Sequence, residues 1–295
     1  MTRQPSLTAG LIGHGIAGSL TPPMHEAEGR AHGLDYRYKR LDTALPPYRD
    51  QSLSQMLDEA ERAGFKGLNI THPFKVQVLP LLDELSPEAS AIGAVNTVRF
   101  RDGQRIGHNT DIGGFTTAFR SELPGVGMDH VLLLGAGGAG AAVAHALIAL
   151  GARALSVISK EPDQTRGLLD ALGALYPGCH LRALDGLNQT ALHGVQGVVN
   201  ATPMGMDAYP GTAIAPDLLR PDMWVSDIVY FPLETALLQE ARAIGCRTMS
   251  GAGMAIHQAA QAFQIITGCR ADVSRLSAEF DRLTTPDPVT PASSG

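Results

Sequence analysis

The sequence predicts an α/β protein built from two units, each with a mostly parallel sheet. Short apolar runs alternate with amphipathic stretches along the first third of the chain, and the alternation resumes near Gly113. Strands that alternate with helical segments are typical of βαβ units, whose strands run parallel. The length of 295 residues suits one large domain or two ordinary ones, and 44% of the residues are hydrophobic, enough to build a buried core.

In the first unit, apolar runs mark three strands, and amphipathic segments mark helices between and after them. The predicted strands are LTAGLIG (residues 7–13), YRYKRLD (36–42) and FKGLNIT (65–71). The predicted helices are TPPMHEAEGRAHG (21–33, starting as a loop), LSQMLDEAERAG (53–64) and KVQVLPLLDEL (75–85). The first two helices end at a glycine, which commonly terminates a helix.

The second unit repeats this order of elements. Its predicted strands are VLLLG (131–135), LSVIS (155–159), GVVNAT (197–202) and MWVSDIVY (223–230). A last helical stretch, MAIHQAAQAFQIITG (254–268), follows these strands. The Pro-, Ser- and Thr-rich end, residues 284–295, is predicted to be a disordered tail.

Charge and cysteine content narrow the function classes. The formal net charge is -6, which disfavours a nucleic-acid-binding surface, because such a surface needs a basic stripe. The three cysteines, Cys179, Cys246 and Cys269, lack metal-ligand spacing, so we expect no metal site. Reduced thiols and the absence of a signal-peptide pattern indicate a cytoplasmic protein.

Residues 131–150 admit a second interpretation. These twenty residues contain no Asp, Glu, Lys or Arg, and a stretch of that length could cross a bilayer. The stretch nevertheless starts as a short aliphatic run, breaks at glycine and resumes with helical spacing. A buried strand, a turn and a buried helix explain it better, so we expect no membrane association.

The turn within this stretch carries a dinucleotide-binding pattern, G-x-G-x-x-G. The first glycine permits a tight turn, the second lets the backbone approach a pyrophosphate, and the third lets the helix pack closely on the strand. The helix N-terminus attracts the phosphates. The pattern alone is weak, but a strand precedes it, a helix follows it and a second strand comes about twenty residues later. The predicted cofactor contacts are Gly135, Ala136, Gly137, Gly138, Ala139 and Gly140.

The choice between NAD and NADP depends on the end of that second strand. An acidic side chain there accepts hydrogen bonds from the ribose 2′-OH and repels a 2′-phosphate, whereas a basic one favours the phosphate. Lys160 is followed by Glu161 and Asp163. The two acids favour NAD, with Lys160 and Glu161 as contacts, and NADP is the alternative.

A second loop, NATPMGM (residues 200–206), follows an apolar strand. At the carboxyl end of a parallel strand, such a loop faces the cofactor crevice. By itself it would be an ordinary turn, so its interpretation depends on the glycine turn. The predicted contacts in this loop are Asn200, Ala201, Thr202, Pro203 and Met206.

Five segments together resemble the shikimate dehydrogenases and the related quinate/shikimate dehydrogenases. They are SLTPPMH (19–25), NITHPFK (69–75), GAVNT (93–97), GHNTDIGG (107–114) and GAGGAG (135–140). NATPMGM, DIVYFPLETALL and GAGMAIHQAAQAF extend the match, and the segments keep the family's order from about residue 10 to residue 270. Each segment is weak alone, whereas the ordered set is specific.

The resemblance implies a fold and a reaction. The fold would have two α/β domains with a cleft between them. The substrate domain would comprise residues 1–112 and 248–295, and a Rossmann dinucleotide-binding domain, residues 113–247, would be inserted between these parts. The reaction would be the reversible NAD(P)-dependent oxidation of the C3 hydroxyl of shikimate, quinate or both to the ketone.

In this comparison, Lys75 matches the family's catalytic lysine and Asp111 matches its partner aspartate. Hydride transfer from a carbon that bears a hydroxyl requires loss of the hydroxyl proton, so a base or a proton relay must lie within hydrogen-bond reach. A lysine in water is protonated at neutral pH, so we assign proton transfer to the pair. Without the resemblance, a single lysine on a loop would be read as solvated.

The resemblance also implies substrate contacts. Ser19 and Thr21 match the residues that hold the substrate carboxylate, and Tyr230 matches a tyrosine near it. The residues that match those holding the ring hydroxyls are Asn69, Thr71, Asn96 and Gln258. Further cofactor contacts are Ile228, Gly251 and Met254. Each of these side chains could also be an ordinary cap or turn residue.

The chain departs from the usual family pattern at three places. Thr21 replaces a serine, Gly18-Ser19 replaces His-Ser, and residues 159–161 (SKE) replace Asn-Arg-Thr. These departures resemble the NAD-using quinate/shikimate branch and put strict NADP use in doubt. The extra methyl group of Thr21 is a small change, so shikimate, quinate and an amino analogue remain open.

Two alternatives stay open at the level of function. One is an NADP-dependent biosynthetic shikimate dehydrogenase or an aminoshikimate dehydrogenase, and the other is a non-catalytic sensor of shikimate or quinate and NAD. The presence of Lys75 and Asp111 favours an enzyme. We expect a small polyhydroxylated cyclohexane carboxylate as the substrate, neither nucleic acid nor membrane as a partner, and a monomer or homodimer.

Overall fold

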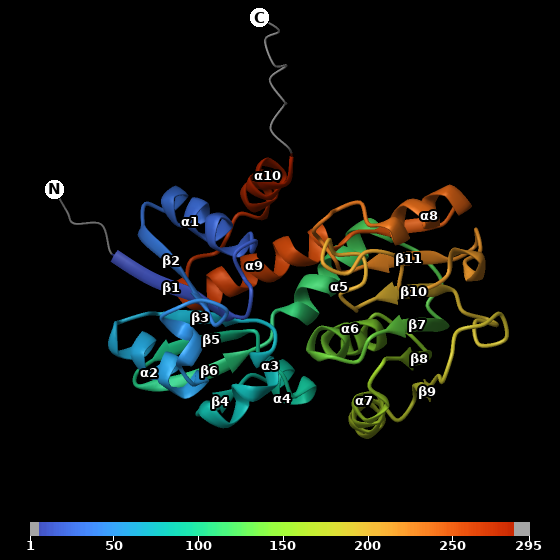
Figure 1. The fold of residues 1–295 in the computed structure, drawn as a ribbon, viewed down its shortest axis with the longest axis horizontal. Coiled ribbons are helices and arrows are strands. Elements are labelled where there is room, and N and C mark those ends of the chain that lie inside the picture. The colour runs from blue at the N-terminus through green and yellow to red at the C-terminus, as the bar shows by residue number, and fades with distance from the viewer. Residues whose placement is uncertain (1–5, 286–295) are drawn as a thin grey trace, which may run out of the picture.

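The computed structural model describes residues 6–285, which form two six-stranded sheets with helices around them (Figure 1). Strands β1 to β6 belong to the first sheet and β7 to β12 to the second. In Figure 1 the first sheet lies at the left and the second at the right, with α5 and α9 between them. The predicted α/β class is confirmed.

The first sheet has the strand order β2-β1-β3-β5-β6-β4. Its strands are β1 (Ser6–Gly13), β2 (Asp35–Asp42), β3 (Gly67–Ile70), β4 (Glu84–Leu85), β5 (Thr97–Arg101) and β6 (Gln104–His108). Because β5 runs antiparallel to both β3 and β6, this sheet is mixed rather than mostly parallel. Asp102 and Gly103 form the turn between β5 and β6, with φ values of 54° and 76°, as a type I′ hairpin turn requires.

The second sheet has the order β12-β11-β10-β7-β8-β9, and all its neighbouring strands are parallel. Its strands are β7 (His130–Leu134), β8 (Ala154–Ile158), β9 (His180–Ala183), β10 (Gly197–Asn200), β11 (Trp224–Asp227) and β12 (Arg247–Met249). In β7, Val131 and Leu133 belong to one apolar cluster, whereas Leu132 and Leu134 belong to another. The strand is therefore buried on both faces, as in a parallel sheet covered by helices.

The helices are α1 (Thr21–Ala31), α2 (Leu53–Arg62), α3 (Phe74–Gln77), α4 (Pro87–Ile92), α5 (Asp111–Glu122), α6 (Gly138–Ala149), α7 (Pro162–Leu175), α8 (Ala236–Ile244), α9 (Gly251–Thr267) and α10 (Val273–Thr284). Short 3₁₀ turns span Tyr48–Asp50, Leu79–Leu81 and Pro216–Leu218. The helix predicted at residues 75–85 is wrong. Pro80 has no N–H to donate and lies at the start of the second 3₁₀ turn, so the segment forms α3, that turn and β4 instead.

Two other expectations concern residues 131–150 and 284–295. The first segment forms β7, a turn and α6, and none of the helices within residues 6–285 is long and apolar enough to cross a membrane. Thr284 still belongs to α10. The remainder of the predicted tail, from residue 286 onward, lies outside the described residues.

Helices α5 and α9 link the two sheets. α5 leads from β6 into β7, and α9 follows β12 and packs on β3 and β5. Glycines permit the two helices to lie close together, because a Cβ at Gly114 would lie 2.8 Å from the carbonyl oxygen of Met254. The boundary predicted after residue 247 falls within β12, which pairs with β11, and the boundary after residue 112 falls within α5.

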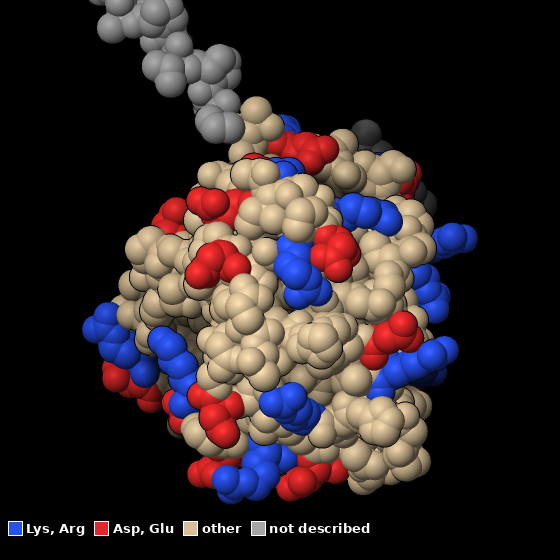
Figure 2. Space-filling view, turned by 90° about the vertical axis from the view of Figure 1, so that its right-hand side faces the viewer, with Lys and Arg blue, Asp and Glu red and all other residues tan. Residues whose placement is uncertain are grey.

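The charged side chains on one face of the molecule are mixed in sign. Figure 2 views the side that carries the second sheet, and Lys and Arg side chains there are interspersed with Asp and Glu. This face thus lacks the continuous basic stripe that nucleic-acid backbones require.

Candidate active site

A lysine and an aspartate from separate helices meet at the candidate active site. Lys75 is the second residue of α3, and Asp111 is the first residue of α5. The Nζ atom of Lys75 donates a hydrogen bond to Oδ2 of Asp111 at 2.7 Å. The side chain of Lys75 is 18% exposed and that of Asp111 is 7% exposed, so the pair is largely shielded from solvent.

The carboxylate of Asp111 is held in one orientation. Its Oδ1 atom accepts a hydrogen bond from Nδ2 of Asn96 at 2.8 Å, and its own N–H donates to Oδ1 of Asn109 at 3.0 Å. Because Asp111 begins α5, the positive end of that helix dipole also favours the negative charge. Oδ2 is consequently the oxygen that faces Lys75.

The Lys75–Asp111 pair lies beside the glycine turn of the second sheet. A Cβ atom built on Gly138, the first residue of α6, would lie 3.6 Å from Cδ of Lys75 and 3.7 Å from its Cβ. Helix α4, which follows this lysine segment, also packs on α6. The Lys75–Asp111 pair, which helices α3 and α5 hold, thus adjoins the predicted dinucleotide loop of the second sheet.

The three glycines of the turn have different surroundings. Gly135 has a φ of 104°, and a Cβ there would lie 2.8 Å from the carbonyl oxygen of Ala201. A Cβ on Gly140 would lie 2.3 Å from the carbonyl oxygen of Gly135, whereas a Cβ on Gly137 would meet nothing within 4 Å. The chain therefore needs two of the glycines for its own packing. Gly137 leaves open space beside the N-terminus of α6, which fits a pyrophosphate.

The loop after β8 presents charges that are free to contact a ribose. Lys160 and Glu161 are exposed, and neither takes part in an ion pair within residues 6–285. The hydroxyl of Ser159 accepts a hydrogen bond from the backbone N–H of Glu161, which fixes the loop. Both an acidic and a basic group are thus available at the position that distinguishes NAD from NADP.

Asp227 anchors the second predicted cofactor loop. It ends β11 and is fully buried. Its Oδ1 atom accepts hydrogen bonds from Nδ2 of Asn200 (2.9 Å) and N–H of Val229 (3.0 Å), and its Oδ2 accepts from Oγ1 of Thr235 (2.8 Å). Asn200 in turn donates to the carbonyl oxygen of Met204. Loop 200–206 is therefore tied to the segment that follows β11.

Replacing Asp227 with asparagine is expected to stabilise the protein at pH 8 by about 1–3 kcal/mol. Burial raises the pKa of this carboxyl to about 6, against the lowering effect of its three hydrogen bonds. The ionised form is thus less favourable in the folded protein than in the unfolded chain, whereas asparagine is neutral and can still accept from Val229 and donate to Thr235.

The advantage of Asp227→Asn over the wild type should shrink as the pH falls through about 6, because the wild-type carboxyl then takes up a proton in the folded state. Urea unfolding at pH 8 and pH 5 measures both differences. Asp217→Asn, at an exposed aspartate, is the control. A stability difference for Asp227→Asn that is the same at both pH values would contradict the assignment.

The predicted substrate residues lie at several places in the fold, among them the start of α1 and the start of α5. Ser19 and Thr21 lie at the N-terminal end of α1, where Thr21 is the first helical residue. Thr71 follows β3, and a Cβ on Gly13, the last residue of β1, would lie 2.4 Å from its Cγ2. At the start of α5, Oε1 of Gln258 lies 3.5 Å from the hydroxyl of Thr110.

Tyr230 lies close enough to Asp111 to sense its charge. Burial, and then the negative charge of Asp111, raise the pKa of the Tyr230 phenol. Its ring also packs near Phe280 of α10, with the ring centroids 6.4 Å apart. The phenol consequently remains a hydrogen-bond donor next to the pair.

Two predicted substrate contacts are buried in the protein instead. Asn69 is 4% exposed, and its amide group donates to the carbonyl oxygen of Asn96 and to Oγ1 of Thr97. Asn96 is 3% exposed, and its amide group donates to Oγ1 of Thr110 and to Asp111. We therefore interpret both asparagines as supports for the site rather than as direct substrate contacts.

Sequence reasoning missed Thr97, Asn109 and Thr110, although all three lie within the quoted segments GAVNT and GHNTDIGG. It also missed Tyr38, which donates to Oδ1 of Asn69 and for which the sequence carries no local signal.

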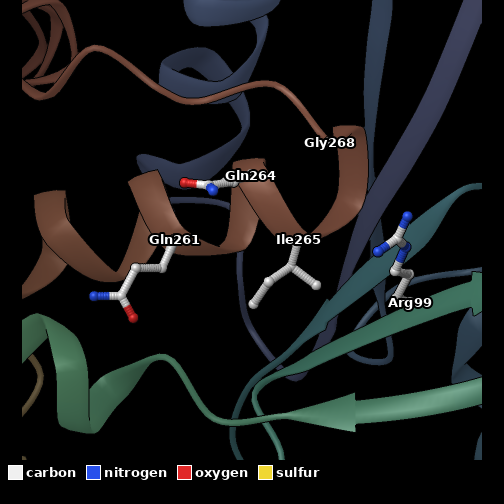
Figure 3. Close-up of a pocket in the computed structure, with 5 residues that line it drawn as sticks. All are labelled: Arg99, Gln261, Gln264, Ile265 and Gly268. Atoms are coloured by element: carbon white, nitrogen blue, oxygen red, sulfur yellow. The ribbon is translucent and has the colours of Figure 1, made fainter.

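A surface hollow between α9 and β5 is lined by Arg99, Gln261, Gln264, Ile265 and Gly268 (Figure 3). None of the predicted site residues lines it.

The sequence and the fold both resemble those of known proteins. The sequence model of one protein family, described as "Shikimate dehydrogenase substrate binding domain", matches residues 11–98. A quinate/shikimate dehydrogenase (NAD(+)) of Corynebacterium efficiens is 48% identical over 93% of this chain and 98% of that protein. A shikimate dehydrogenase (NADP(+)) of Pseudarthrobacter chlorophenolicus is 44% identical over 97% and 98%, respectively. The structure of quinate dehydrogenase from Corynebacterium glutamicum in complex with NAD has a TM-score of 0.89 and 46% identity, and the match covers 94% of this chain and 99% of that one.

Proposed function

Because the chain belongs to the shikimate dehydrogenase family, we propose that it is a dehydrogenase that interconverts shikimate or quinate and the corresponding 3-dehydro ketone, with NAD as the cofactor. The observation that carries this proposal is the 2.7 Å contact between Lys75 and Asp111 beside Gly138. It combines a group for proton transfer with an open glycine turn at a helix N-terminus.

In the proposed mechanism, the chain binds the substrate and manages its proton. The ring hydroxyl at C3 hydrogen-bonds to the Lys75–Asp111 pair, which takes up the hydroxyl proton as the C–H bond breaks. The glycine turn at Gly137 would hold NAD, which would supply the hydride acceptor for C3. In the reverse direction the pair returns the proton to the oxygen. Such proton transfer contributes about 10²–10⁴ to the rate.

We propose that the substrate carboxylate binds at the start of α1. The hydroxyls of Ser19 and Thr21 lie there, and both can donate a hydrogen bond to a carboxylate. The hydroxyls rather than the backbone would hold the anion, because Pro22 and Pro23 have no N–H and the N–H groups of Thr21 and Met24 already donate to Ser19 and Leu20. Tyr230 would approach the same substrate from the segment after β11.

The domains follow from this assignment. We propose that the substrate domain comprises the first sheet with α9 and α10, and that the cofactor domain comprises β7 to β12. Placing the second boundary after Met249 rather than after residue 247 keeps β12 whole. The cleft between the domains would then contain Lys75 and Gly138.

The experiment that tests the function is a matrix of initial rates, with NAD and NADP each combined with shikimate, quinate and 3-dehydroshikimate (reduced cofactor for the ketone). We expect higher kcat/KM with NAD than with NADP, and turnover of shikimate, quinate or both. Preference for NADP would support a biosynthetic shikimate dehydrogenase. Binding of NAD and shikimate without turnover in any combination would overturn the enzymatic proposal and favour a sensor.

Replacing Glu161 with alanine is expected to weaken NAD more than NADP. The exposed carboxylate can accept hydrogen bonds from the 2′-OH of NAD and repels the 2′-phosphate of NADP. We expect the ratio of kcat/KM for NAD to that for NADP to fall about tenfold, which corresponds to about 1.4 kcal/mol. The matched control is Asp163→Ala, because Asp163 already pairs with Arg166. An unchanged ratio for Glu161→Ala would refute the role of this loop.

We also propose that the protein works in the cytoplasm as a monomer or a homodimer. Its three cysteines, Cys179, Cys246 and Cys269, are all free, as is usual in a reducing compartment.

A further inference from the structure

A buried chain of hydrogen bonds extends behind Asp111, away from Lys75. Oη of Tyr38 donates to Oδ1 of Asn69 at 2.6 Å, and Nδ2 of Asn69 donates to Oγ1 of Thr97 at 2.9 Å. Oγ1 of Thr97 donates to Oδ1 of Asn96 at 3.0 Å, and Nδ2 of Asn96 donates to Oδ1 of Asp111 at 2.8 Å. Four hydrogen bonds in series thus connect a tyrosine on β2 with the carboxylate on α5.

The register of the first sheet places Tyr38, Asn69 and Thr97 on one face. Asn69 on β3 pairs directly with Thr97 on the neighbouring strand β5. Tyr38 on β2 pairs with Ala9 of β1, and β1 lies between β2 and β3. On β1, Ala9 pairs with Tyr38 and Leu11 pairs with Asn69, so the tyrosine reaches Asn69 diagonally across β1. All five polar members are less than a tenth exposed.

Backbone groups, which cannot reverse their roles, fix the direction of every bond. The N–H of Thr110 donates to Oδ1 of Asn96, so Nδ2 of Asn96 must face Asp111. Thr97 must then donate to the same Oδ1. Because the carbonyl oxygen of Asn96 accepts from Nδ2 of Asn69, Oδ1 of Asn69 faces Tyr38, and the phenol must be the donor.

Every donor in the chain therefore points toward the carboxylate. Hydrogen bonds in series polarise one another in a buried site, so each donor strengthens the next. Burial raises the pKa of Tyr38 and keeps the phenol protonated. His25, whose ring lies against that of Tyr38, has a pKa lowered by burial to about 3. The far end of the chain is consequently neutral.

We infer that Tyr38 and Thr97 are positioning residues for the reaction, which hold Asp111 in its working orientation through Asn69 and Asn96. This inference rests on the proposed function. Thr97 is fully buried and Tyr38 lies behind Asn69, so the two residues act through Asp111 and not by touching the substrate. Backbone groups still orient both asparagines when either hydroxyl is lost, but the series of hydrogen bonds is interrupted. The bond from Asn96 to Oδ1 of Asp111 is then less polarised and holds the carboxylate less firmly.

The test compares variants that remove one hydroxyl each. Thr97→Val keeps the shape of the side chain, and we expect kcat to fall about tenfold while KM for NAD and for substrate stays within about twofold. Tyr38→Phe acts one link further away, and we expect a decrease of about threefold. Thr97→Ser should restore most of the turnover because it retains the hydroxyl.

The matched control is Tyr36→Phe. Tyr36 is also buried on β2, but its hydroxyl contacts His25 and not the chain. We expect Tyr36→Phe to lower the melting temperature about as much as Tyr38→Phe while leaving kcat unchanged. This comparison separates positioning of Asp111 from a general contribution to folding.

A double-mutant cycle gives the decisive result. In an Asp111→Asn background, Thr97→Val should have no further effect on the residual kcat, because the group that it positions has already been lost. If the wild type is active and Thr97→Val keeps at least half of its kcat, the inference alone is overturned. The inference is also overturned if Thr97→Val lowers kcat in the Asp111→Asn background by the same factor as in the wild-type background. An inactive wild type would overturn the proposed function and the inference with it.

Discussion

Replacing Lys75 with alanine should lower kcat by about 10²–10⁴, while the dissociation constant of NAD stays nearly unchanged. The variant loses the ammonium group that shares the proton with Asp111, at a contact of 2.7 Å in the wild type. The glycine turn, which would hold the cofactor, retains its own packing contacts between Gly135, Gly140 and Ala201.

A second variant separates chemistry from packing. The stem of Lys75 lies beside Gly138, and Lys75→Met retains that hydrocarbon contact while removing the charge. Both variants should lose turnover to a similar extent. Lys66→Ala, which removes an exposed lysine, should behave as the wild type.

Steady-state kinetics and NAD titration by fluorescence provide the measurements. If Lys75→Ala weakened NAD binding as much as it reduced kcat, the residue would be structural. If Lys75→Met recovered most of kcat, the contact with Gly138 rather than the proton transfer would explain the loss.

The alternation of strands and helices was readable from the sequence, because parallel strands buried on both faces are continuous apolar runs, as in β7. The β5–β6 hairpin was missed although the sequence RDGQ carries the Asp-Gly signal of its turn. The polar residues of β5 and β6 gave no apolar run to mark them. The helix predicted at residues 75–85 matched the helical period, but Pro80 outweighed that pattern.

The proximity of Lys75 and Asp111 depends on tertiary structure. The two residues are 36 positions apart and belong to different helices, so no periodicity in the chain relates them; only the resemblance to a known family suggested the pair. The roles of Asn69 and Asn96 depend on which residue faces which across β3 and β5. A single sequence does not specify that register when hydrophobic patterning is short, as in the four residues of β3.

Replacing Gly137 with alanine is expected to weaken NAD binding at least about tenfold without lowering stability by more than about 1 kcal/mol. Gly137 is the N-cap residue of α6, with a φ of -71° that alanine also adopts. The new Cβ would meet no protein atom within 4 Å. It would instead occupy the space through which the backbone must approach the pyrophosphate, so the loss appears only when the cofactor binds.

The same substitution at Gly140 should have the opposite profile. A Cβ there would lie 2.3 Å from the carbonyl oxygen of Gly135. Because Gly140 belongs to α6 and Gly135 directly follows β7, neither atom can move away without shifting the helix from the strand. We expect a loss of about 1–3 kcal/mol or more in unfolding free energy even without cofactor. Gly167→Ala, in open space on α7, should be neutral or slightly stabilising and is the control.

Urea unfolding without cofactor and NAD titration of each variant distinguish the two glycines. The decisive variant is Gly137→Ala, because it is predicted to weaken NAD binding while the cofactor-free protein stays nearly as stable as the wild type. If Gly137→Ala bound NAD as tightly as the wild type, the pyrophosphate could not lie over this turn. The proton-transfer pair beside Gly138 would then lack a nicotinamide within reach, since the same turn that holds the phosphates must also set the distance from the cofactor to Lys75.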